Sequence, residues 1–290
     1  MNTKRIISLV ASLALVLSLS VGLTGCGDKA AQDDNQGSTD GEGTKYTVGI
    51  CQLVQHEALD AATQGFIDAL NEALPGQVEF QNKNASGDSA NCSTIVNGFV
   101  SDGVDLIMAN ATPALTAAAS ATSDIPILGT SITAYGVALD MDDFTGTVGG
   151  NISGTSDLAP LDQQAAMIQE LFPDAKNIGL LYCSAEANSQ YQVDEMTKYL
   201  TELGLTATAF AFTDTNDVAS VAQAACDASD VLYIPTDNTA ASNTEAIANV
   251  VLPAKVPVIA GEAGICEGCG IATLSISYYD LGVATGKMAA

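Results

Sequence analysis

Apolar and polar residues follow a strand-and-helix rhythm over most of the chain after residue 45. Short apolar runs at 46–53, 178–182 and 231–234 predict buried strands. Longer segments such as 59–73 and 189–203 carry apolar residues every three or four positions, which predicts helices with one buried face. Strands and helices that alternate at such short intervals are typical of parallel sheets covered by helices.

This alternation lapses between residues 131 and 156, which are rich in Gly, Asp and Thr. We interpret the stretch as a connection between two lobes, because 290 residues suffice for two hydrophobic cores. The predicted fold is therefore α/β, with two Rossmann-like parallel-sheet lobes joined by a hinge. The N-terminal lobe is expected at 45–155 and the C-terminal lobe at 156–277, with 278–290 returning to the first lobe.

The first 26 residues have the pattern of a bacterial export signal. Lys4 and Arg5 precede an apolar run over residues 6–17 that is too short to be a comfortable membrane span. The residues Leu-Thr-Gly-Cys at 23–26 resemble the lipobox of bacterial lipoproteins, which implies that Cys26 is lipidated and becomes the mature N-terminus. The alternative is a soluble secreted protein with a fortuitous Cys26. The polar stretch 27–44 is expected to be a flexible tether to the extracytoplasmic face of the cell membrane.

Charge and composition exclude several functions. The formal net charge is −25, from 34 acidic and 9 basic residues, and it would repel nucleic acid. His56 is the single histidine, and no GxSxG nucleophile elbow accompanies it. The chain also lacks a phosphate-binding loop of the Walker type. We therefore predict a protein that is not an enzyme, with no catalytic residues and no cofactor.

The seven cysteines give little indication of a metal site. Cys266 and Cys269 form the one close pair in the sequence, and a local disulfide between them is a plausible alternative to two free thiols. An isolated CxxC pair without a second pair or a nearby histidine is weak support for zinc. We assign no metal to the chain.

Polar clusters follow most of the predicted strands. In open parallel sheets, ligands bind beyond the carboxyl ends of the strands, where loops and helix N-termini meet. Asn188 and Ser189 are good N-cap residues, so a helix starting there could receive a ligand carboxylate beside Glu186, which could take an ammonium group. The alternative is an ordinary helix cap with a solvated Glu186.

Three further positions have two readings each. Asp237 is the best single candidate for an ammonium group, and the alternative is an Asx-turn that ends a strand. Asp157 could face the cleft, but a cap for the helix opened by Pro160 is the reading we favour. His56 is expected to hydrogen-bond within its loop, and contact with a ligand is the alternative.

Several short motifs occur together and in order along the chain. They are QHEALD (55–60), QGF (64–66), NASGD (84–88), ATP (111–113), GTSD (154–157), EANS (186–189), PTDN (235–238) and YYDLG (278–282). With these motifs the chain resembles the substrate-binding lipoproteins of bacterial ABC importers with the class I periplasmic-binding-protein fold, in the family associated with tryptophan and tyrosine uptake. It departs from that family at Glu57, where a proline is usual, and family members continue beyond the helix in which this chain ends.

The resemblance implies an extracytoplasmic receptor that captures an amino acid, with an aromatic one favoured, and delivers it to an ABC permease and its ATPase. It places nine positions at the ligand-binding cleft: Gln55, Thr112, Asp157, Glu186, Asn188, Ser189, Asp237, Asn238 and Glu262. A sensor of the same fold that acts on a signalling partner is an alternative. An extracellular hydrolase is a weaker one, because the chain has few candidate acid and base groups.

Overall fold

The computed structural model describes residues 45–290, which belong to one compact unit. The predicted signal peptide (1–26), the lipidated Cys26 and the tether (27–44) lie outside the described residues. Over residues 45–290, no helix is both long enough and apolar enough to cross a membrane.

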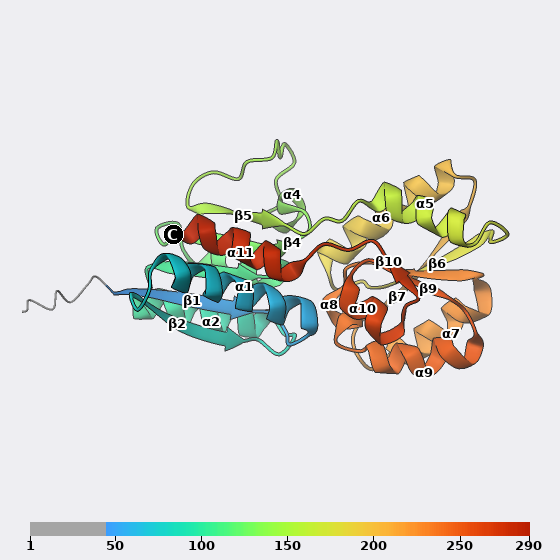
Figure 1. Cartoon of the computed structure of the whole chain (residues 1–290), viewed down its shortest axis with the longest axis horizontal. Helices are drawn as coiled ribbons and strands as arrows, with labels where there is room; N and C mark the ends of the chain where they lie inside the picture. Colours follow the sequence, from blue (N-terminus) through green and yellow to red (C-terminus); the bar gives the residue numbers. More distant parts are fainter. Residues whose placement is uncertain (1–44) are drawn as a thin grey trace, which may run out of the picture. The chain divides into compact units, whose positions relative to one another are not determined.

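The first lobe is built on a five-stranded parallel sheet with the strand order β2-β1-β3-β4-β5 (Figure 1). Its elements, in chain order, are β1 (Tyr46–Gln52), α1 (Glu57–Ala73), β2 (Val78–Asn84), α2 (Ser89–Asp102), β3 (Leu106–Asn110), α3 (Thr112–Ala121), β4 (Ile127–Ile132), α4 (Tyr135–Ala138) and β5 (Ile152–Ser156). The last helix of the chain, α11 (Tyr278–Ala289), packs along α1, and both helices contact this sheet.

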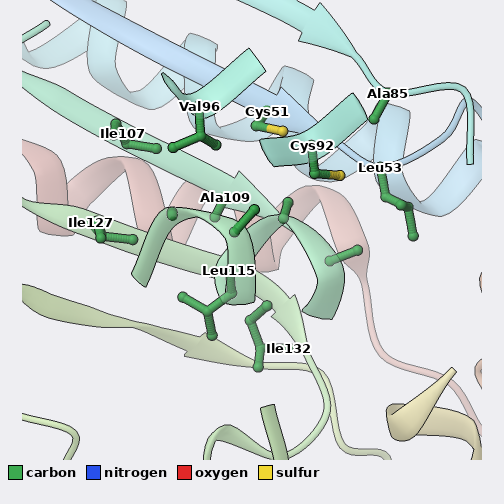
Figure 2. Close-up of a cluster of buried hydrophobic side chains, with 14 of the residues drawn as sticks. Cys51, Leu53, Ala85, Cys92, Val96, Ile107, Ala109, Leu115, Ile127 and Ile132 are labelled. Carbon is green, nitrogen blue, oxygen red and sulfur yellow. The ribbon is translucent and has the colours of Figure 1, made fainter. Parts of the chain in front are cut away.

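Both faces of this sheet are covered, which explains why its central strands are apolar almost throughout. On one face, Val48 and Ile50 of β1 pack against Phe66 and Leu70 of α1. On the other face, side chains of the strands meet side chains of α2 and α3 in the cluster that Figure 2 shows, where Cys51 lies near Cys92.

Close contact between α1 and α11 depends on glycine. A Cβ atom at Gly65 would collide with the backbone carbonyl of Tyr279, and one at Gly282 would collide with the backbone of Ala62. The two helices therefore approach more closely than larger side chains would allow (Figure 1). The predicted lobe limits at 155 and 277 stay a prediction.

The second lobe repeats the architecture, with a five-stranded parallel sheet in the order β10-β9-β8-β6-β7. Its elements are α5 (Leu161–Leu171), β6 (Asn177–Cys183), α6 (Ala187–Glu202), β7 (Thr206–Phe212), α7 (Val218–Ala228), β8 (Val231–Ile234), α8 (Asn238–Ala241), α9 (Thr244–Ala254), β9 (Val258–Ala260), α10 (Ala263–Cys269) and β10 (Ala272–Thr273). Helices α5 and α6 cover one face, and α7, α9 and α10 cover the other. The predicted α/β fold with two parallel-sheet lobes is confirmed.

The structure also corrects some local predictions. The supposed connection 131–156 contains α4 and the edge strand β5, whose sequence has a single large apolar residue, Ile152. Helix α6 begins at Ala187 with Glu186 at the N-cap, so Asn188 and Ser189 lie inside the helix and do not cap it. Helix α5 starts after Pro160 without a side-chain cap, so Asp157 does not have the capping role that we favoured.

Candidate functional site

A small cavity lies between residues of the two lobes. The start of α1, the end of β4 and the segment after β5 line it from the first lobe, and α6, the β8–α8 turn and the start of α10 line it from the second. Its volume is about 10 Å³, which is room for about one water molecule. Polar side chains make up most of the wall, including Ser131, Asp157, Asn188, Asp237 and Glu262.

Three atoms on this wall are buried without a hydrogen-bond partner among residues 45–290. They are Ser131 Oγ, Asp157 Oδ1 and Asn188 Oδ1. The three residues are only 4–6% exposed, so bulk water does not satisfy these atoms. Each unpaired buried polar group costs about 1–3 kcal/mol. Because all three line one cavity, a polar ligand placed there would satisfy them together.

Asp157 lies on the first of the two segments that pass between the lobes, directly after β5. Tyr278, at the end of the second such segment, donates its hydroxyl to Asp157 Oδ2 at 3.0 Å. Burial raises the pKa of Asp157, and the hydrogen bond from Tyr278 opposes part of that rise. One carboxylate oxygen is therefore held by the second crossover, and the other, on a residue that lines the cavity, is buried without a hydrogen-bond partner in residues 45–290.

The N-terminus of α1 provides hydrogen-bond donors. His56 is the N-cap residue, with extended backbone and no side-chain capping bond. The amide groups of the first helical turn have no partner within a helix, and Ala58 and Leu59 of that turn line the cavity. Aligned peptide dipoles give this end of a 17-residue helix a partial positive charge. The cavity therefore combines an anion-binding helix end with the unpaired oxygens of Asp157 and Asn188.

Glu186 is held within the second lobe. Its Oε1 accepts bonds from the backbone N–H of Thr239 at 2.8 Å and from the Thr239 hydroxyl at 2.7 Å. Its Oε2 accepts bonds from the backbone and side chain of Asn238 and from Asn188 Nδ2. Glu186 does not line the cavity but a larger groove of about 360 Å³ beside it. Its carboxylate organises the neighbouring loop.

Asp237 lines the cavity, but both of its oxygens already accept backbone bonds. Cys183 donates its N–H to Oδ2 at 2.7 Å, and Ala240 donates its N–H to Oδ1 at 2.7 Å, which caps α8. Burial, followed by the charge of Glu186, raises the pKa of Asp237 to about 7. Asp237 is thus a turn and cap residue in this structure, as the Asx-turn reading described.

The remaining predicted residues divide between cavity and surroundings. Asn238 and Glu262 line the cavity, and Glu262 also caps α10 by accepting the N–H groups of Gly264 and Ile265. Gln55 lines an adjoining pocket of about 330 Å³. Thr112 and Ser189 are buried and are not part of the cavity wall. The structure thus brings Asp157, Asn188, Asp237, Asn238 and Glu262 together around one cavity.

Several residues of the cavity wall were not among the predicted site residues. Ser131 was predicted to lie at the start of the connection between the lobes, and its unusual backbone (φ 56°) cannot be inferred from the sequence. The amides of Ala58 and Leu59 belong to residues with apolar side chains, so side-chain chemistry gave no signal for them.

Within residues 45–290, His, Cys, Asp and Glu side chains form no group of three or more that could hold a metal ion. The six cysteines in that range, Cys266 and Cys269 included, are free thiols.

Comparison with known proteins gives a consistent result. The family model described as "ABC transporter substrate binding protein" matches residues 47–290. A tyrosine-binding protein of Clostridioides difficile (strain R20291) is 35% identical over 300 residues, covering 99% of this chain and 84% of that protein. A domain from Streptococcus pneumoniae in complex with L-Trp is 36% identical with a TM-score of 0.81, covering 85% of this chain and 84% of that one.

The ligand-free, open structure of a substrate-binding protein with adhesive properties from Clostridium difficile is also 36% identical, over 84% of this chain and 83% of that one. Its TM-score is 0.61, against 0.81 for the L-Trp complex. At equal identity and almost equal coverage, the present structure is thus closer to the ligand-bound relative. The family match covers most of the chain, and the chain belongs to the ABC transporter substrate-binding protein family.

Proposed function

We propose that this protein binds an aromatic amino acid between its two lobes and delivers it to the permease and ATPase of an ABC importer. Two relatives support the ligand class, because one is named a tyrosine-binding protein and the other was solved with L-Trp. In this proposal the protein is a binding protein without catalytic activity. It acts at the extracytoplasmic face of the membrane, held there by a lipid on Cys26.

The unpaired polar atoms of the cavity carry the proposal. A ligand ammonium group would donate to Asp157 Oδ1 and Asn188 Oδ1, both of which are buried acceptors without a partner within the described chain. A hydrogen bond from a charged donor contributes roughly 1.5–3 kcal/mol of net stabilisation. Asp157 follows β5 of the first lobe, whereas Asn188 belongs to the second lobe, so one ammonium group would connect both.

The ligand carboxylate would lie at the other pole of the cavity, against the first-turn amides of α1. Ala58 and Leu59 line the wall there, and the Ser131 hydroxyl is free to donate a further bond. The residues that line the cavity include no lysine or arginine. Recognition of the carboxylate would therefore rest on backbone amides and the helix dipole.

Entry of the ligand requires the lobes to separate, because a cavity of about 10 Å³ is far smaller than an amino acid. The two crossover segments next to Asp157 and Tyr278 are the places where a hinge rotation would occur. Ligand contacts to both lobes would then favour the closed arrangement over the open one.

Calorimetry on the full chain tests this function. L-tryptophan, L-tyrosine and L-phenylalanine are expected to bind, whereas N-acetyl-L-tryptophan, which lacks the ammonium group, is not. Asp157→Asn should weaken binding roughly 10- to 100-fold, because it keeps the shape and removes the charge. Asp142→Asn, the same change at an exposed position, is the matched control and should leave affinity unchanged. Binding of the N-acetyl compound as tight as that of L-tryptophan would refute the ammonium site.

A further inference from the structure

We infer that His56 is a positioning residue that fastens the N-terminus of α1 to the second lobe through Asn238 when the lobes are closed. The inference rests on the proposed function, since it concerns how the closed form holds its ligand. His56 Nε2 lies 3.2 Å from Asn238 Oδ1, and the two residues are 182 positions apart in the chain. His56 is the N-cap residue of α1, and Asn238 is the first residue of α8.

The hydrogen bonds around Asn238 determine which atom is the donor. Asn238 Nδ2 donates to Glu186 Oε2 at 2.7 Å, and the backbone N–H of Asn238 donates to the same oxygen at 3.1 Å. This arrangement directs the amide oxygen of Asn238 toward His56, and an amide oxygen can only accept. His56 must therefore carry a proton on Nε2 and donate it across the cavity.

The surroundings of His56 favour the neutral ring. Burial lowers its pKa, while the bond to Asn238 and the charges of Glu186 and Asp60 oppose part of that decrease. The positive end of the α1 dipole also disfavours a second proton. A neutral ring with its proton on Nε2 provides one directed bond without adding a charge beside the ligand carboxylate.

The position of His56 links this bond to the ligand. Ala58 and Leu59, which line the cavity and whose amides belong to the first turn of α1, follow His56 by two and three residues. Fixing His56 to Asn238 therefore fixes these donors relative to Asn188 and Asp237 of the second lobe. Without the bond, the closed form should open more often and the ligand should leave faster, whereas the association rate should change little.

Two substitutions of His56 separate the bond from general packing. The terminal nitrogen of glutamine reaches the place of histidine Nε2, so His56→Gln keeps the donor. Asparagine is shorter and matches Nδ1, so His56→Asn loses it. We expect the dissociation rate of L-tryptophan, measured by stopped flow, to rise about 3- to 10-fold in His56→Asn, the range that a net hydrogen bond supports. His56→Gln should stay within about twofold of the parent.

A double-mutant cycle adds the partner residue. In an Asn238→Ala background, His56→Asn should have no additional effect on the dissociation rate, because the bond is already absent. Additive effects of the two substitutions, or equal rates in His56→Asn and His56→Gln, would overturn the inference. Thermal denaturation of each variant verifies that it is folded.

Amide hydrogen exchange of the ligand-free full chain separates this inference from the proposed function. The ligand-free chain closes part of the time, and the bond shields residues 57–59 only in closed molecules, so exchange there should be faster in His56→Asn than in the parent and in His56→Gln. If L-tryptophan does not bind the parent, the proposed function fails and hydrogen exchange still decides the role of His56. If L-tryptophan binds and neither the dissociation rate nor the exchange responds, only the role of His56 is refuted.

Discussion

Asp157 and Asp237 both line the cavity, and the structure predicts opposite consequences of replacing them. Asp237 accepts the N–H of Cys183 on one oxygen and the N–H of Ala240 on the other. The first bond ties the end of β6 to the β8–α8 turn, and the second caps α8. Asp237→Ala is therefore expected to destabilise the fold and to leave the affinity for an aromatic amino acid nearly unchanged.

The size of this effect follows from the two lost bonds. Removal of a helix cap costs about 0.5–2 kcal/mol. Leaving the buried Cys183 N–H without an acceptor costs a further ~1–3 kcal/mol. Loss of a carboxyl group whose charged form is disfavoured by burial offsets part of this cost. At about pH 4, where that offset is small, the free energy of unfolding should fall by roughly 2–4 kcal/mol, and Tm by roughly 5–15 °C for a chain of this size.

Asp157→Asn is the comparison variant. Asparagine still accepts the hydroxyl proton of Tyr278, so the bond between the two crossovers persists. The charge opposite the ligand ammonium is lost, and the dissociation constant should rise roughly 10- to 100-fold. The ligand-free Tm should stay level or rise, because burial disfavours the ionised carboxyl that is removed.

For each variant, thermal unfolding of the ligand-free full chain gives Tm, and calorimetry with L-tryptophan gives the dissociation constant. Calorimetry is carried out well below the lowest Tm, so that every variant is folded. Asp237→Ala with an unchanged Tm and abolished binding would refute the assignment. That result would show that Asp237 binds the ligand ammonium group, as the sequence first indicated. The unpaired oxygen of Asp157 would then not have its proposed role.

Two further predictions concern stability. Gly65→Ala should lower the free energy of unfolding by about 1–3 kcal/mol, because its Cβ would meet the Tyr279 carbonyl of α11. The control Gly98→Ala, in the exposed part of α2 with no atom near the new Cβ, should raise it by about 0.5–1 kcal/mol in urea unfolding. Equal signs for the two would contradict the close packing of α1 on α11. The pKa of Asp237, raised to about 7 in the folded state, predicts a pH effect. Between about pH 4 and 7 the unfolded chain loses this proton while the folded protein keeps it, so the residue lowers stability as pH rises and its full penalty is reached above pH 7. The stability of the parent minus that of Asp237→Asn, which does not titrate here, should therefore fall by up to ~4 kcal/mol from pH 4 to pH 8; a flat difference would show that the carboxyl group titrates normally.

Most elements of the fold could be predicted from periodicity, because both sheets are buried on both faces. Strand β8 has the bounds that its apolar run predicted, Val231–Ile234. The missed elements are those with weak apolar signals. Edge strand β5 has one large apolar side chain, and α10 spans only seven residues that Glu262 caps.

Proximity in sequence was also a poor guide to the cysteines. The close pair in sequence was Cys266 and Cys269, whereas the structure places Cys92 of α2 against Cys51 of β1 in the core of the first lobe (Figure 2). The two thiols lie in one buried cluster although 41 positions separate them in the chain. Only the docking of α2 on the sheet brings them together, and no local pattern encodes that contact.

The candidate site, too, could be predicted from the sequence only in part. The positions of the strand ends indicated where polar residues would gather. Five of the nine predicted residues line the cavity. The sequence could not rank the acidic residues, because Asp157, Glu186 and Asp237 are alike carboxylic acids in short polar motifs that follow strands. Their ranking depends on which carboxylate oxygens the protein satisfies by itself, and that depends on loops whose backbone N–H groups have no side-chain signature.

The distribution of unpaired atoms between the lobes bears on how binding and closure are coupled. A ligand shifts an equilibrium between open and closed forms only by the difference in its affinity for the two. If Glu186 and Asp237 held the ammonium group, the contact would lie within the second lobe and would be equally strong in both forms. Asp157 lies on a crossover that Tyr278 joins to the other crossover, and it lines the same cavity as Asn188 of the second lobe and the start of α1. A zwitterion bound there as proposed would contact both lobes and the hinge at once, so most of its affinity would exist only when the lobes are closed.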